Sequence, residues 1–122
     1  MGLWRSTLAH MAGGFALQGG WAVFANMAHP MPAPLIAGLV QGMVSAIVTL
    51  GLKHMIEAIS ARTTGLPGLV LPPLTTCIIS VTLLFTIHRL AGTPEVWATL
   101  AFPSTIATLY AALYTFRLRS HQ

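Results

Sequence analysis

The sequence predicts an all-α integral membrane protein with four transmembrane helices in two hairpins. Of its 122 residues, 55% are hydrophobic and only 7% are charged, whereas an ordinary soluble domain carries about 25% charged residues. The mean hydropathy of +0.76 indicates the same class. Four apolar stretches are each long enough to cross a bilayer, which takes about 20 residues. We therefore expect residues 1–122 to form a single membrane domain.

The first two predicted spans are residues 7–28 and 34–60, and a proline-rich connection separates them. Pro34 suits the first turn of the second helix, where its missing amide hydrogen leaves no bond unmade. The third span is residues 68–90 and follows a break at residues 63–67. Because Pro72 and Pro73 stand near its beginning, this helix either starts there or is kinked there.

The fourth predicted span is residues 94–118, with Pro94 expected in its first turn and Pro103 in its interior. The two halves, residues 1–62 and 63–122, share a hairpin plan. That similarity is compatible with an internal duplication, but any protein with four spans divides into two hairpins.

The basic residues predict the orientation of the spans. Five of them fall on one side of the membrane if there are four spans, and only Arg89 falls on the other. These five are Arg5, Lys53, Arg62, Arg117 and Arg119. Since cytoplasmic loops carry the excess of Lys and Arg, we expect both termini in the cytoplasm and the protein in a bacterial-type inner (plasma) membrane.

A polar stripe runs along the second predicted helix. Polar residues recur every four positions through the apolar run 35–59, at Gln41, Ser45, Thr49, Lys53 and Glu57. Residues four apart share a helix face, and lipid disfavours polar groups on such a face. The stripe should therefore face other helices or a polar cavity, and Gln41, Ser45 and Thr49 are the predicted substrate pathway.

Small residues adjoin this stripe. Gly38, Gly42 and Ala46 form a small-xxx-small series on the second helix, and Ala12, Ala16 and Gly20 form one on the first. Such faces allow close helix contact in lipid. The contact lies either within one copy of the chain or between two copies of a homodimer.

A basic cluster is expected near the cytoplasmic interface: Lys53, His54, Arg62, Arg117 and Arg119. Such residues suit the phosphate of a lipid head group. The alternative for Lys53 is a surface ion pair with Glu57, four positions along the helix. His54 and Glu57 are too few ligands for a metal. At the opposite end, His29 and His88 are expected near the outer surface, where they would be either structural or sensitive to pH.

The sequence carries no motif for catalysis. It has no nucleophile motif, phosphate-binding loop or paired intramembrane carboxylates, so we expect no enzyme, no cofactor and no metal site. Six scattered basic residues form no basic face, which argues against nucleic acid as a partner.

The chain resembles the GtrA-type family of small four-span membrane proteins. The resemblance lies in its length, its two hairpins and the aromatic-basic end of its last helix, residues 108–119. An Asn-Phe pair expected before the basic residue is missing in both halves. The resemblance implies a role in moving lipid-linked sugars across a membrane.

Two functions fit these patterns. One is a small transporter or lipid-carrier flippase component, acting as a homodimer or with a larger membrane protein. The other is a non-catalytic accessory subunit of a larger membrane complex, in which the polar stripe only joins helices.

Overall fold

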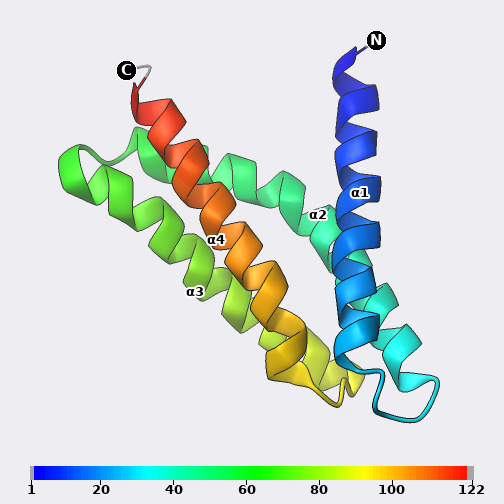
Figure 1. Ribbon diagram of the computed structural model, residues 1–122. Coiled ribbons are helices and arrows are strands. Elements are labelled where there is room, and N and C mark those ends of the chain that lie inside the picture. Colours follow the sequence, from blue (N-terminus) through cyan, green and yellow to red (C-terminus); the bar gives the residue numbers. More distant parts are fainter. Residues whose placement is uncertain (1, 121–122) are drawn as a thin grey trace.

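The computed structural model describes residues 2–120, without the side chains of residues 2–7 and 10. These residues form four α-helices: α1 (Gly2–Ala25), α2 (Ala33–Ala61), α3 (Gly65–Ala91) and α4 (Val96–Ser120) (Figure 1). The predicted all-α class is confirmed for this part of the chain. Helices α2, α3 and α4 are long and apolar enough to cross a membrane. The Arg5 side chain, one of the five basic residues that predict the membrane orientation, lies outside the described residues.

The prolines match the start of α2 but not the starts of α3 and α4. Pro34 lies in the first turn of α2, as predicted. The prediction for Pro94 is wrong, because α4 begins at Val96 and the Glu95 carbonyl accepts the first helical bond, from the Thr99 amide at 2.9 Å. Helix α3 begins at Gly65, well before Pro72 and Pro73, so a helix starting at those prolines is also wrong.

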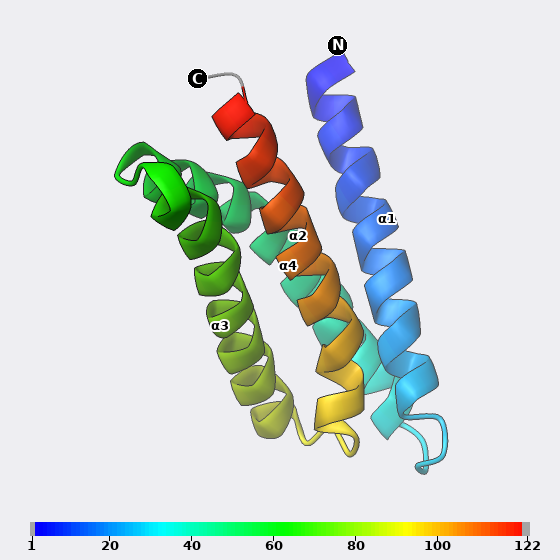
Figure 2. The same cartoon turned by 60° about the vertical axis from the view of Figure 1, so that its left-hand side comes forward.

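The helices form two hairpins, α1–α2 and α3–α4, and α2 joins them by packing on α1, α3 and α4. Both chain ends lie at one end of the bundle, and the connections at residues 26–32 and 92–95 lie at the other (Figure 1). Helices α1 and α4 are close together near these connections and separate towards the other end of the bundle (Figure 1), while Figure 2 shows α3 and α4 side by side along the hairpin that they form.

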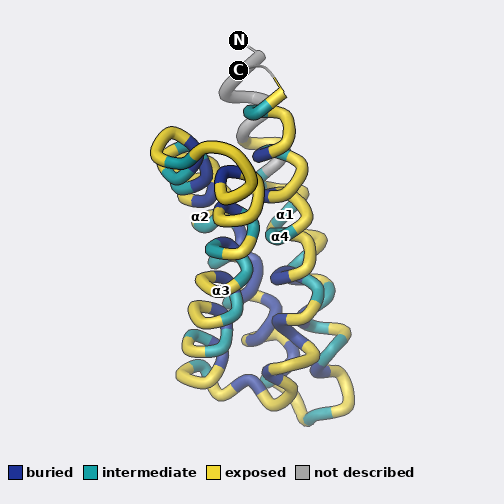
Figure 3. Tube along the Cα trace, turned by 90° about the vertical axis from the view of Figure 1, so that its left-hand side faces the viewer, coloured by how far each residue is buried: buried dark blue, intermediate teal, exposed yellow. Residues whose placement is uncertain are grey.

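Among the described residues, many polar side chains are buried and many large hydrophobic side chains are exposed. Figure 3 shows how the buried and exposed residues are distributed along the helices. Gln41 and His88 are 0% exposed, whereas Leu90 is 84% exposed. A soluble protein would have the reverse distribution, because in water the hydrophobic effect favours burial of large aliphatic side chains. In lipid this driving force is absent and exposed polar groups are unfavourable, so this distribution is the one expected of a membrane protein.

Glycines set the contact between α1 and α2. A Cβ atom added at Gly19 would lie 2.9 Å from the Gly38 carbonyl oxygen, and one added at Gly42 would lie 2.9 Å from the Phe15 ring. Helix α1 of the same chain therefore packs directly against Gly38 and Gly42, as the alternative of a contact within one copy of the chain predicts. On α1, Ala12, Ala16 and Gly20 are exposed, so this series makes no close helix contact within the chain, and a contact between two copies stays a prediction. Ala46 is half-buried.

Candidate functional site

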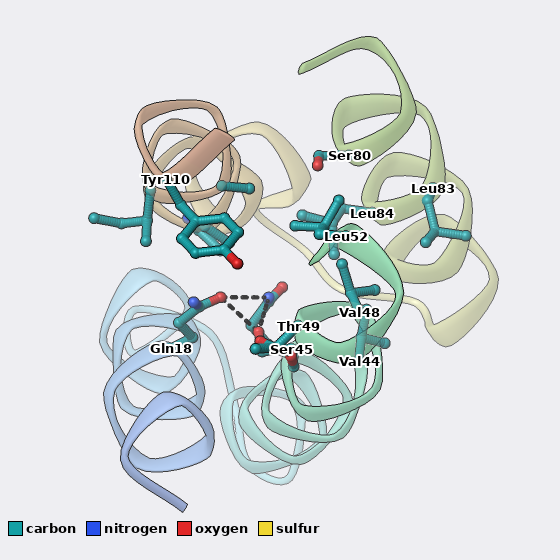
Figure 4. A pocket seen from close by; sticks show the side chains of 14 residues that line it. Gln18, Val44, Ser45, Val48, Thr49, Leu52, Ser80, Leu83, Leu84 and Tyr110 are labelled. Carbon is teal, nitrogen blue, oxygen red and sulfur yellow. Dashed lines mark hydrogen bonds between the residues drawn. The ribbon is translucent and has the colours of Figure 1, made fainter. Parts of the chain in front are cut away.

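All four helices line a pocket of about 160 Å³ (Figure 4). Helix α2 supplies the largest share of its wall, and the predicted pathway residues Gln41, Ser45 and Thr49 all belong to it. The pocket is lined by Gln18 from α1; Gln41, Val44, Ser45, Val48, Thr49 and Leu52 from α2; Ser80, Leu83 and Leu84 from α3; and Pro103, Ile106, Ala107 and Tyr110 from α4. Thr49, Ile106 and Tyr110 are exposed, so the wall reaches the surface on their side.

A hydrogen-bond network forms the polar wall of the pocket. The Ser45 hydroxyl donates to Gln18 Oε1 at 2.5 Å. The Gln41 amide nitrogen donates to Ser45 Oγ at 2.9 Å and more weakly to Gln18 Oε1 at 3.4 Å. The network therefore ties α1 to α2 across the face where the pocket lies (Figure 4).

His88 extends this network into α3. Its Nε2 atom lies 2.8 Å from Gln41 Oε1, and its Nδ1 atom lies 2.7 Å from Thr93 Oγ1. Because an amide oxygen only accepts hydrogen bonds, His88 Nε2 must carry the proton and donate it. A neutral imidazole then accepts at Nδ1 from the Thr93 hydroxyl. His88 thereby fixes the Gln41 amide with its nitrogen towards Ser45 and Gln18.

A second group of polar contacts closes the connection end of the bundle. The Asn26 amide nitrogen donates to Thr99 Oγ1 at 2.7 Å, and Asn26 Oδ1 accepts from the Glu95 amide at 2.9 Å. His29 Nε2 lies 2.9 Å from Glu95 Oε1. The Trp21 indole donates to the Ala98 carbonyl at 3.0 Å. We call Asn26, His29, Glu95 and Thr99 the loop-end cluster; it holds α1 against the start of α4.

The polar stripe is interior only at its beginning. Gln41 and Ser45 are buried, but Thr49 and Lys53 are exposed and Glu57 is half-buried. Each four-residue step advances about 40° around a helix, so Lys53 lies about 120° and Glu57 about 160° from Gln41. The buried face continues instead at Leu52 and Ile56. The stripe therefore leaves the bundle interior after Ser45, and Lys53 and Glu57 lie towards the end of α2, outside the buried face.

The basic cluster divides into exposed side chains and one structural side chain. Lys53, His54, Arg62 and Arg117 are exposed. Arg119 is half-buried and donates from Nη2 to the carbonyl oxygens of Ser60 at 3.0 Å and Thr63 at 2.6 Å. It therefore caps the C-terminal end of α2, where free carbonyls need donors.

The acidic side chain near this cluster has partners other than Lys53. Glu57 Oε2 accepts from the Tyr114 hydroxyl at 2.5 Å. Its other oxygen, Oε1, lies 3.8 Å from His54 Nδ1. Among the side chains that the structure describes, no group of three His, Cys, Asp or Glu residues could hold a metal ion.

Sequence patterns missed three residues of the polar interior. Gln18 and Asn26 are isolated polar residues in the first apolar stretch, and their positions within it were the available signal. His88 was expected at an interface, and it lies in the last turn of α3, but it is fully buried. Its position four residues after Leu84, on the buried face of α3, distinguishes it from an interfacial histidine.

Comparison with known proteins gives no relative: the chain matches no protein-family model, no curated protein and no solved structure. The function must therefore be argued from the pocket itself.

Proposed function

We propose that this chain is a four-span transporter or lipid-carrier flippase component of a bacterial-type inner membrane, with both termini cytoplasmic. In this proposal α1 is the fourth span: its 24 residues reach about 36 Å at 1.5 Å per residue, against a hydrocarbon core of about 30 Å. The pocket is the binding site.

The observation that carries this proposal is an amphipathic pocket inside an apolar bundle. Gln18, Gln41 and Ser45 line one wall, and Leu52, Leu84 and Ile106 are among the residues of the others. Polar groups at membrane depth are expensive and are found mainly where they line a path or a site. A pocket that joins a polar wall to apolar walls suits an amphiphilic substrate.

The arrangement of the helices favours access from the end that carries the chain termini. The loop-end cluster holds α1 to α4 at the opposite end, and α1 and α4 diverge towards the termini (Figure 1). Arg62 and Arg117 are exposed at that same end. Under the proposed orientation they meet the phosphates of the cytoplasmic leaflet.

Labelling of single cysteines, each introduced in a Cys77→Ala background because the chain has one native cysteine, tests the proposal. Thr49→Cys, in the wall of the pocket, should react with a membrane-impermeant maleimide applied to inside-out vesicles and not with the reagent applied to right-side-out vesicles. Met43→Cys is the matched control, because Met43 is 52% exposed on the same helix but does not line the pocket. Equal protection of both cysteines from both sides would refute a pocket accessible from the cytoplasm.

One observation favours the accessory-subunit alternative. Both polar atoms of the Gln41 side chain bond to other side chains of the bundle, at Gln18, Ser45 and His88, which is how polar groups join helices in a membrane. A fixed larger partner that co-purifies with the chain and blocks labelling of Thr49→Cys would support this alternative.

A further inference from the structure

We infer that the pocket binds an uncharged group that carries both hydrogen-bond donors and acceptors and is about the size of one six-membered ring. This inference rests on the proposed function, since it names the chemistry of the substrate at the same site. It is carried by three properties of the pocket: its unused hydrogen-bonding groups, its lack of charge and its volume.

Ser80 provides a buried hydroxyl without a partner. It is 3% exposed, it lines the pocket, and its Oγ atom makes no hydrogen bond to the described residues. Helical Ser and Thr hydroxyls commonly bond to the carbonyl four residues earlier, as Thr86 does to Thr82 on the same helix. A buried polar group left unpaired is unfavourable, so a ligand that bonds to Ser80 would remove that penalty.

Two more groups around the pocket keep hydrogen-bonding capacity. The contacts of Gln18 with Ser45 and Gln41 all use its Oε1 atom, which leaves its amide hydrogens without an acceptor among the described residues. The Tyr110 hydroxyl points into the pocket towards the Gln18 and Ser45 side (Figure 4). The amide donates, and the Tyr110 and Ser80 hydroxyls both donate and accept.

None of the 14 lining residues carries a formal charge. An ion transferred into such a site loses its hydration without gaining a counter-charge, which disfavours it far more than a neutral polar group. Lys53 is the closest cation along α2, one turn beyond Thr49, and it is exposed outside the lining. A charged part of the substrate would therefore remain outside the pocket.

The volume limits the size of the bound group. At about 160 Å³, the pocket is close to an engineered protein cavity of about 150 Å³ that binds benzene. One ring with a small polar substituent fills this space.

Three probes of nearly equal shape test the inference: cyclohexanecarboxamide, cyclohexanecarboxylate and cyclohexylmethylammonium. Their binding is measured by equilibrium dialysis against the whole chain in lipid nanodiscs at neutral pH, with empty nanodiscs subtracted. The carboxamide should bind saturably and at least tenfold more tightly than either ion. Ser80→Ala should weaken its binding about two- to tenfold, the effect of one hydrogen bond. The matched Thr86→Ala variant, which removes an exposed hydroxyl from the same helix, should leave it unchanged.

Gln18→Leu provides a second variant with the same expected direction, so the test does not depend on the folding of one protein. If either ion binds as tightly as the carboxamide, the inference is overturned while the pocket remains a binding site. If Ser80→Ala and Thr86→Ala bind equally, the assignment of the Ser80 hydroxyl to the ligand is overturned. If none of the three probes binds, both the inference and the pocket as binding site fail.

Discussion

The hydrogen bond between Gln41 and His88 offers a direct test of the polar interior. We consider the substitution Gln41→Leu, which keeps the approximate volume of the side chain and removes both of its polar atoms. The bonds lost are the 2.8 Å bond from His88 Nε2, the 2.9 Å bond to Ser45 Oγ and the weaker 3.4 Å bond to Gln18 Oε1. Ser45 keeps its bond to Gln18, so the main consequence is at His88.

The expected loss of stability follows from the group left behind. His88 is 0% exposed, so its Nε2–H would be buried without an acceptor, and an orphaned buried donor costs about 1–3 kcal/mol. Hydrogen bonds between membrane helices average about 0.6 kcal/mol in double-mutant cycles, which favours the lower part of this range. We expect Gln41→Leu to lower the free energy of unfolding by about 1–1.5 kcal/mol.

The double variant Gln41→Leu/His88→Leu separates this cause from general disruption of packing. Replacing both partners by apolar groups removes the orphan, so the double variant should be at least about 1 kcal/mol more stable than the sum of the single effects. Unfolding in mixed micelles, followed by circular dichroism, measures all three proteins. Met43→Leu is the control on the exposed face of α2.

Two results would refute this reasoning. One is a loss below about 0.5 kcal/mol for Gln41→Leu, which would mean that His88 finds another acceptor at no cost. The other is additivity of the two substitutions, which would mean that Gln41 and His88 are not coupled.

Three further predictions use the same unfolding assay. Asn26→Ala should cost about 1–3 kcal/mol because the Glu95 amide loses its acceptor, and a loss no larger than that of the exposed Thr105→Ala control would contradict this. Gly68→Ala should destabilise the chain because its Cβ would clash with Arg119 Nη2 and displace it from the Ser60 and Thr63 carbonyls. The same substitution in an Arg119→Ala background should cost less, and an equal cost in both backgrounds would place the clash elsewhere. Gly38→Val should cost more than about 1 kcal/mol by forcing α1 from α2, since even a Cβ there would clash with Val23 Cγ2; an unchanged midpoint would mean that the helices repack freely.

The buried beginning of the polar stripe was predictable, and the place where it ends was not. Gln41 and Ser45 stand in a run of apolar and small residues, so their burial follows from the hydropathy of that run. Whether Thr49 and Lys53 share that burial depends on how far the stripe drifts around the helix, and on where α1, α3 and α4 approach α2. Spacing along one helix contains no information about its neighbours.

The roles of Arg119 and His88 were beyond sequence patterns for a related reason. Arg119 was grouped with the other basic residues by charge, but the meeting of the ends of α2 and α4 gives it the carbonyl oxygens of Ser60 and Thr63. His88 looked interfacial by position, but Gln41 and Thr93 enclose it. Charge and position along the chain do not reveal which polar partner another helix supplies.

The sequence by itself determined the helical class, the hairpin plan and the polar beginning of α2, because hydropathy, proline positions and spacing are local properties of a chain. The tertiary structure decided which polar atoms form hydrogen bonds and which glycines α1 packs against. It also decided that the four helices leave an uncharged pocket between them. Those features depend on contacts between residues as far apart as Gln41 and His88, and only the packing of the helices brings such residues within hydrogen-bonding distance.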